Sequence, residues 1–434
     1  MIVYLTGNYI KRKDVSERKK RAAFVFSIAL NIGLLVFFKY VYFFITSIAE
    51  LISLFGSGYP DTNLSATSYF FASLAIPLGI SYLTFQSIGY LIEVNRGTIE
   101  AEKNVGVLAG YLLFFPKLIA GPVERAAHFL PQIKPTIIFD YDRISSGMKQ
   151  FGWGLFKKLL IADRLGLFVN SVYADVHHNT GYSLLIAAIL FPIQLYADFS
   201  GYTDMALGLA KILGYDLQPN FNQPFSAKSI VELWRKWHIS LSAWFNDYFY
   251  TPIVIKKRDL GKWSVVCASM TTFLILGLWH GPNWTYVIFG GIQGFFIALE
   301  LFTSKARKRL RKNIPVQINN IAGMIYMFVI FSFSCIFFRS GGVADALYFI
   351  RHLFSGVENL ASLKVSLQSH ALAMSDYVIA ILTIPCMFFV EAKGLSEWIV
   401  HSPIWIRWPI YYLFLSVIIV YGVSSGAGFI YKQF

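Results

Sequence analysis

Hydrophobic residues dominate the chain in long runs that recur from one end to the other. Short polar or basic segments separate these runs, which cover residues 22–38, 69–92, 182–197, 264–279, 284–299, 321–338, 377–390 and 408–421. A helix needs about 20 apolar residues to cross the roughly 30 Å core of a bilayer, and several runs approach that length. The pattern predicts an all-α, polytopic transmembrane protein that forms one integral-membrane domain over residues 1–434.

Composition excludes a chain built of soluble domains. Hydrophobic residues make up 56% of the sequence and charged residues only 14%, too few charges to cover soluble surfaces. The cysteines, Cys267, Cys335 and Cys386, lie in separate apolar runs and predict neither a disulfide framework nor a CxxC metal site. His177 and His178 have no further ligands at metal-binding spacing, so we expect no metal.

The positive charge is concentrated beside the apolar runs. The net charge is +14, and most of it falls in residues 11–21, 256–262 and 305–312, each next to a membrane segment. This placement is typical of cytoplasmic loops, and such loops can also contact anionic membrane lipid. A nucleic-acid surface would require a basic face on a soluble module, which the sequence lacks.

Loop charge also predicts the topology. The basic segment 11–21 places the first span, residues 22–48, in the outward direction, and the loop 49–68, which has no Lys or Arg, on the external side. Residues 69–94 then return to the cytoplasmic side. Between residues 105 and 250, shorter apolar pieces alternate with charged ones, which indicates short, tilted or re-entrant helices around a protein-lined cavity.

A histidine lies at the turn of the clearest hairpin. Residues 264–279 should cross outward and residues 284–302 should return, with His280 between them and Pro282 and Asn283 breaking the helix. Sixteen helical residues rise only about 24 Å, less than the roughly 30 Å core. We therefore expect His280 within the membrane, nearer the external side.

Other ionisable residues also fall in apolar surroundings, where they are functional candidates by default. Asp198 and Asp204 lie in one such segment. In another, Glu232, Arg235 and His238 follow at i, i+3 and i+6, close to one face of a predicted helix. An interfacial amphipathic helix, or an ion-pair cluster between helices, explains the same residues without catalysis.

The imidazole of His280 suits proton transfer, because an unperturbed histidine titrates near pH 6.5 and the neutral ring can accept a proton. A general base that acts on a hydroxyl needs this property and a dry, oriented site. The alternative is a neutral histidine bonded to a backbone carbonyl. The GVSSG stretch at 422–426 follows an apolar helix rather than a strand, so we interpret its match to a hydrolase motif as chance.

Six segments together resemble the membrane-bound O-acyltransferases, in particular the bacterial branch typified by the alginate O-acetyltransferase membrane subunit. They are PLGISYLTFQSIGYLIEVNRG (77–97), FFPKLIAGPVERAAHFLPQI (114–133), YADFSGYTDMALGLAKILGYDLQPNFNQPF (196–225), ELWRKWHISLSAWFNDYFYTPI (232–253), GLWHGPNWTYVIFGG (277–291) and FSFSCIFFRS (331–340). The pairing of RKWHISLSAWFNDY with GLWHG is the most specific part of this resemblance.

The resemblance implies a fold and a site. The fold would have about 9–11 membrane helices, with re-entrant segments around a central funnel and the core motifs at 77–340. His280 would be the catalytic histidine and His238 a second histidine of the same site. The residues expected to shape or support it are Asp198, Arg235, Trp237, Asp247, Trp279 and Asn283.

The resemblance also implies an activity: O-acetylation of an extracytoplasmic polysaccharide, alginate or another cell-surface glycan, by a multi-pass protein of the inner (cytoplasmic) membrane. The donor would be acetyl-CoA or another acyl thioester on the cytoplasmic side, with no bound cofactor. A separate SGNH-type acyltransferase outside the membrane would be the partner. The alternatives are D-alanyl transfer to teichoic acid by a related branch, and transport of acyl or sugar carriers, which the lack of an internal repeat disfavours.

Two features depart from the family pattern. The family usually begins with one or two further apolar segments, so we expect the chain to be shortened at its N-terminus. Gln293 stands where relatives often carry a second histidine of the hairpin, and an amide can form hydrogen bonds but cannot titrate. His280 itself is present, so we expect activity.

Overall fold

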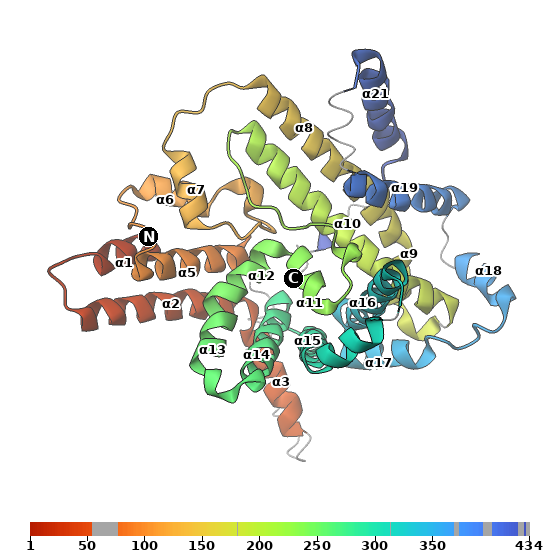
Figure 1. Cartoon of the computed structure of the whole chain (residues 1–434), viewed down its shortest axis with the longest axis horizontal. Helices are drawn as coiled ribbons and strands as arrows, with labels where there is room; N and C mark the ends of the chain where they lie inside the picture. The colour runs from red at the N-terminus through yellow and green to blue at the C-terminus, as the bar shows by residue number, and fades with distance from the viewer. Residues whose placement is uncertain are drawn as a thin grey trace.

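The computed structural model describes residues 1–53, 77–179, 181–312, 314–368, 373–393, 402–423 and 429–430. These residues form helices and no strand (Figure 1). The α-helices are α1 (Ile2–Ile10), α2 (Glu17–Lys39), α3 (Val41–Ser53), α5 (Ile80–Arg96), α6 (Val105–Leu112), α7 (Ala126–Ile133), α8 (Tyr141–Phe156), α9 (Asp163–Ala174), α10 (Tyr182–Ile212), α11 (Ile230–Lys236), α12 (Ile239–Phe245), α13 (Thr251–Lys256), α14 (Lys262–His280), α15 (Trp284–Arg311), α16 (Val316–Arg339), α17 (Val343–His352), α18 (Leu360–Gln368), α19 (Met374–Lys393) and α21 (Ile404–Tyr421).

Seven helices in the described part of the chain are long and apolar enough to cross a membrane. They are α2, α10, α14, α15, α16, α19 and α21. The predicted all-α, polytopic membrane class is therefore confirmed. Only residues 77–92 of the run at 69–92 are among the described residues, and α5 starts within them at Ile80.

Two of the predicted spans have different limits in the structure. The span expected at 22–48 is two helices, because α2 ends at Lys39 and Tyr40 leaves helical geometry with φ −120° and ψ −14°. In Figure 1, α3 turns away from the axis of α2. The run at 182–197 continues as a 31-residue helix, α10, through Pro192. The helix continues because packing in the core overrides the local tendency of proline to end it.

The region around residues 105–250 contains the short helices that the sequence predicts. α6 and α7 have 8 residues each, and α11 and α12 have 7 each. A helix this short is marginal alone, so its stability comes from tertiary packing. The long helix α10 packs mainly against α8, α9 and α16, and its residues from Tyr196 to Thr203 are all buried.

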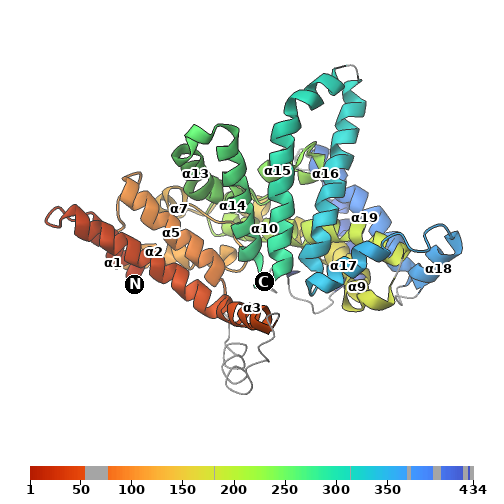
Figure 2. The ribbon, with the colours of Figure 1, turned by 90° about the horizontal axis from the view of Figure 1, so that it is seen from below.

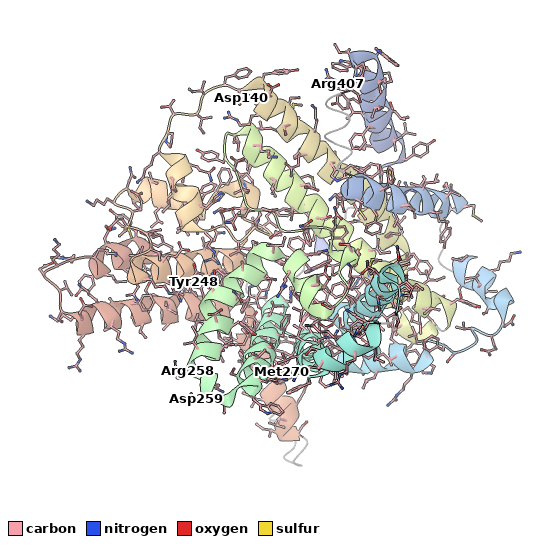
Figure 3. The ribbon with its side chains drawn as sticks, in the orientation of Figure 1. Asp140, Tyr248, Arg258, Asp259, Met270 and Arg407 are labelled. Carbon is pink, nitrogen blue, oxygen red and sulfur yellow. The ribbon has the colours of Figure 1, made fainter. Side chains whose placement is uncertain are left out.

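The hairpin of α14 and α15 is close-packed. A Cβ added to Gly290 would lie 3.2 Å from Cα of Gly277. Figure 2 shows the turn before α14 and the turn after α15 projecting on the same side of the molecule. The first turn carries the basic segment 256–262, whose Arg258 and Asp259 lie at the molecular edge in Figure 3, and the segment 305–312 forms the last turns of α15 and its C-cap. The arrangement agrees with the predicted hairpin, since α14 ends at His280 and α15 begins at Trp284.

Glycine pairs bring α8 and α10 into backbone contact. Gly147 meets Gly208 and Gly154 meets Gly201: a Cβ on Gly147 would lie 2.6 Å from the Gly208 carbonyl oxygen, and one on Gly201 would lie 2.8 Å from that of Gly154. Small residues permit such approach between membrane helices, where dispersion rather than apolar burial drives association.

We predict that Gly154→Ala lowers stability, because the added methyl group would clash with the backbone of α10. Overpacking of this kind costs about 1–3 kcal/mol. Gly33→Ala in α2 is the control, since no atom lies within 4 Å of its added Cβ and alanine favours a helix by about 1 kcal/mol. The thermal midpoint of the purified protein should fall for Gly154→Ala only. Equal midpoints for both variants would show that the glycine contact is unimportant.

Candidate active site

His280 is buried at the C-terminal end of α14, only 4% exposed. Its ring is enclosed by aromatic side chains from its own helix and the next two. Ring centroids lie 5.0 Å away for Trp279, 6.2 Å for Phe289 of α15 and 5.1 Å for Phe338 of α16. These rings exclude water and restrict the orientation of the imidazole.

His238 lies in a break between two short helices. α11 ends at Lys236 and α12 begins at Ile239, and His238 itself has φ 46° and ψ 52°. Left-handed backbone is uncommon outside glycine and is often kept at functional sites. The prediction that Glu232, Arg235 and His238 share one helix face is therefore wrong, because the break redirects the chain before His238. Its side chain is only 1% exposed, so His238 does not face lipid or water as a residue on the outer surface of an interfacial helix would.

Hydrogen bonds to neighbouring segments hold this break. The amide of Ile239 donates to the carbonyl of Asn220 over 2.8 Å, and the amide of Asn222 donates to that of Lys236 over 3.0 Å. At the other end of α11, Glu300 of α15 accepts from the amide of Ile230 over 2.8 Å. The backbone groups that helix ends leave unsatisfied are thus paired on both sides of α11.

Trp279 and Tyr82 bring the two histidines into one site. The Trp279 ring lies 6.4 Å from that of His238 and 5.0 Å from that of His280. The Tyr82 hydroxyl of α5 is 3.4 Å from Nε2 of His238. Gly121, with φ +82°, permits this position, since a Cβ there would lie 2.7 Å from the Tyr82 ring. Nothing in its apolar run distinguished Tyr82 from a packing aromatic.

Two further predicted residues have structural contacts beside the site. Trp237 is 3% exposed and packs against Phe331 with ring centroids 5.1 Å apart. Asn283 caps α15: its Oδ1 accepts from the amide of Thr285 over 3.0 Å, and its Nδ2 donates to the carbonyl of Gly341 over 2.8 Å. Asn283 therefore fixes the turn that follows His280.

Asp198 belongs to a buried ion-pair cluster between α10 and the π-helical turn Lys157–Ala162. Its carboxylate lies 2.7 Å from Nζ of Lys158, which also pairs with Asp163 over 2.8 Å. Lys157 pairs with Asp204 over 2.7 Å. This arrangement corresponds to the structural alternative, an ion-pair cluster between helices. Phe199, the neighbour of Asp198, contacts His238 with centroids 4.7 Å apart.

The structure does not bring Arg235 and Asp247 to the histidines. The side chain of Arg235 is exposed. That of Asp247 is 45% exposed and pairs with Arg125 over 2.6 Å. Arg125 also donates to the hydroxyl of Tyr248, which is labelled in Figure 3, and Tyr248 in turn donates to Glu93. Asp247 thus belongs to a separate polar network.

Gln293 is fully buried and joins three helices. Its Oε1 accepts from Nε1 of Trp234 in α11 over 3.0 Å, and its Nε2 donates to the hydroxyl of Ser334 in α16 over 2.7 Å. A polar bridge of this kind satisfies buried groups without titrating. The side-chain amide of Gln293 therefore has a structural role in this protein, because it links α11 and α16 to α15.

The described residues contain no group of three or more metal-ligating side chains. His177 pairs with Asp345 over 3.2 Å and His178 with Asp175 over 2.6 Å, and both histidines are more than half exposed. The stretch at 422–426 lies largely outside the described residues.

Comparison with known proteins gives a family match that covers both histidines. The model of the membrane-bound O-acyltransferase family matches residues 104–339. A probable alginate O-acetylase of Pseudomonas aeruginosa is 32% identical over 352 residues, which is 81% of this chain and 64% of that protein. One of Azotobacter vinelandii is 32% identical, over 87% of this chain and 73% of that protein.

A relative whose name gives a different acceptor matches this chain with nearly the same identity and coverage. A peptidoglycan O-acetyltransferase of Helicobacter pylori is 30% identical, over 76% of this chain and 64% of that protein. The chain thus spans slightly less than two thirds of the length of the Pseudomonas and Helicobacter proteins. The family match over more than half of the chain and the similarity to the Azotobacter protein show that this chain belongs to the membrane-bound O-acyltransferase family.

Proposed function

We propose that the protein transfers an acyl group, most simply acetyl, from a thioester to a hydroxyl for O-acetylation of a polysaccharide outside the cytoplasm. The observation that carries this proposal is the shared, buried position of His238 and His280 within the region matched by the family. A water-poor enclosure favours transfer to a hydroxyl over hydrolysis of the thioester.

His280 is the general base in this reaction. Its neutral imidazole accepts the proton of the acceptor hydroxyl as that oxygen attacks the thioester carbonyl carbon. The carbon–sulfur bond then breaks, and the departing thiolate takes the proton back from the imidazolium. The products are an ester and a free thiol, and the imidazole is regenerated. Positioned proton transfer of this kind contributes about 10²–10⁴-fold to a rate.

His238 supports the same site, because the ring of Trp279 contacts both imidazoles. Its left-handed backbone and its contact with the Tyr82 hydroxyl restrict the orientation of the His238 ring. Holding reacting groups in this way lowers the barrier by restricting their motion.

The donor approaches from the cytoplasm and the acceptor from outside. The basic turns beside α14 and α15 support this sidedness, because they predict a cytoplasmic location at the end of the hairpin remote from His280. The donor is acetyl-CoA or another acyl thioester, and the protein resides in the inner membrane. A separate SGNH-type acyltransferase on the outer side completes transfer to the polymer.

Alginate or a similar surface glycan is the acceptor class that we favour, because relatives named as probable alginate O-acetylases match over 81% and 87% of the chain. A teichoic acid D-alanyltransferase of Bacillus subtilis is 30% identical but matches only 54% of the chain. D-alanyl transfer is therefore the second candidate.

We predict that His280→Ala abolishes esterification of the surface glycan, with a loss of at least about 100-fold, because the variant lacks the general base. Mass spectrometry of glycans from cells expressing wild-type or variant protein measures this and distinguishes acetyl from D-alanyl esters. His178→Ala, at an exposed histidine, is the control. Undiminished esterification with His280→Ala would refute the role of His280, and D-alanyl esters would favour the second candidate.

We also predict that His238→Ala strongly reduces the initial rate of acyl transfer, whereas Arg235→Ala leaves it close to the wild-type rate. His238 is buried at the site, and Arg235 is exposed. The measurement is thiol release from a donor thioester by equal amounts of purified protein. A strong effect of Arg235→Ala together with a weak effect of His238→Ala would contradict this prediction, because it would show that acyl transfer needs the exposed Arg235 more than the buried His238.

A further inference from the structure

Lys39 is a buried cation that contacts the end of the helix carrying His280. It is the last residue of α2 and only 5% exposed. Its Nζ donates to the carbonyl of Trp279 over 2.7 Å and lies 3.4 Å from the carbonyl oxygen of His280. The sequence contained a signal for this residue: a lysine within the apolar stretch VFFKYVYFF.

Tyr40 contacts the same end of α14. Its hydroxyl lies 3.0 Å from the carbonyl oxygen of Leu278 and 3.1 Å from that of Trp279. Two consecutive side chains therefore converge on the last three helical carbonyls, those of residues 278–280. The break between α2 and α3 at Tyr40 is what turns both side chains toward this point.

The chemistry of a helix end explains why these contacts matter. The last carbonyls of a helix have no intrahelical partner and carry partial negative charge, so a cation there is favourable. Buried lysine is costly, and within the described residues no carboxylate lies within 4.0 Å of the Lys39 ammonium. The charge is compensated instead by the carbonyls and by the ring of Trp279, whose centroid is 5.7 Å from Nζ.

The following helix strengthens the same attachment. α3 contacts the start of α15 through Phe43 and Trp284, with centroids 5.5 Å apart, and Nε1 of Trp284 donates to the hydroxyl of Ser47 over 3.1 Å. The turn between α14 and α15 is thus held from both sides of the break at Tyr40. His280, as the last residue of α14, depends on this attachment for its orientation.

We propose that Lys39 is a positioning residue for acyl transfer: its ammonium, with the hydroxyl of Tyr40, holds the last turn of α14 so that the His280 imidazole stays aligned for proton transfer. This inference rests on the proposed function of His280. A terminal turn without these donors would fray, and small displacements of a catalytic group can cost about 100-fold in rate.

The test compares kcat and KM of full-length wild-type protein, Lys39→Met and Lys39→Arg in lipid vesicles. Methionine keeps the length without the charge, and arginine restores a cationic donor. We expect Lys39→Met to lower kcat by about 10–100-fold with little change in the KM for the donor thioester, and Lys39→Arg to recover most of it. Lys19→Met, at an exposed lysine of α2, is the control and should match the wild type.

Wild-type kcat in Lys39→Met, or an effect on KM alone, would overturn the inference. If Lys39→Met does not accumulate as folded protein, Tyr40→Phe is the second variant, because it removes a hydroxyl that contacts the same carbonyls and keeps the charge of Lys39. Tyr40→Phe should lower kcat without altering KM. An unchanged kcat in Tyr40→Phe would overturn the inference. The same assay on His280→Ala separates the two proposals. Activity in His280→Ala refutes the proposed function, whereas an inactive His280→Ala beside a fully active Lys39→Met refutes only the role of Lys39.

Discussion

Backbone groups at the ends of buried helices must be paired within this protein, and that requirement determines how the helices around the two histidines are arranged. Helix ends that lie within an apolar environment leave amides and carbonyls that water does not reach, and each must find a partner inside the protein. Glu300 accepts from the start of α11, the carbonyl of Asn220 accepts from the start of α12, and Lys39 donates to the end of α14. Because the two histidines lie at such ends, the groups that satisfy the backbone also determine where the imidazoles point.

Aromatic packing and close helix contacts complete the site. Trp279 contacts both histidines, while Phe199 and Phe338 cover them from α10 and α16. The glycine contacts between α14 and α15 bring the backbones of the hairpin together. These features explain how the polar ring of His280 can be buried among apolar helices: neighbouring aromatic side chains cover it. Proton transfer in such surroundings depends on fixed protein groups rather than on solvent.

The sequence predicted those parts of the structure that depend on local pattern. Runs of apolar residues predicted the helical membrane class, and loop charge placed His280 at a hairpin turn, where Pro282 and Asn283 mark the end of the helix. The breaks at Tyr40 and His238 were not predictable, because neither contains glycine or proline and both are set by partners distant in the chain. The pairing of Asp198 with Lys158 is non-local for the same reason. Motif membership alone also could not separate buried His238 from exposed Arg235.

The central claim is that His280 joins a cytoplasmic donor to an external acceptor. The decisive measurement is acetyl transfer across vesicles in which the purified protein has one orientation. An isotopically labelled acetyl thioester is placed on the cytoplasmic side. An impermeant polysaccharide, together with any outer transferase that is required, is placed on the other side. We expect label in ester bonds of the polysaccharide in vesicles that contain wild-type protein, and label only in the donor compartment with His280→Ala. Transfer only when donor and acceptor share a compartment, or equal transfer by both proteins, would contradict it.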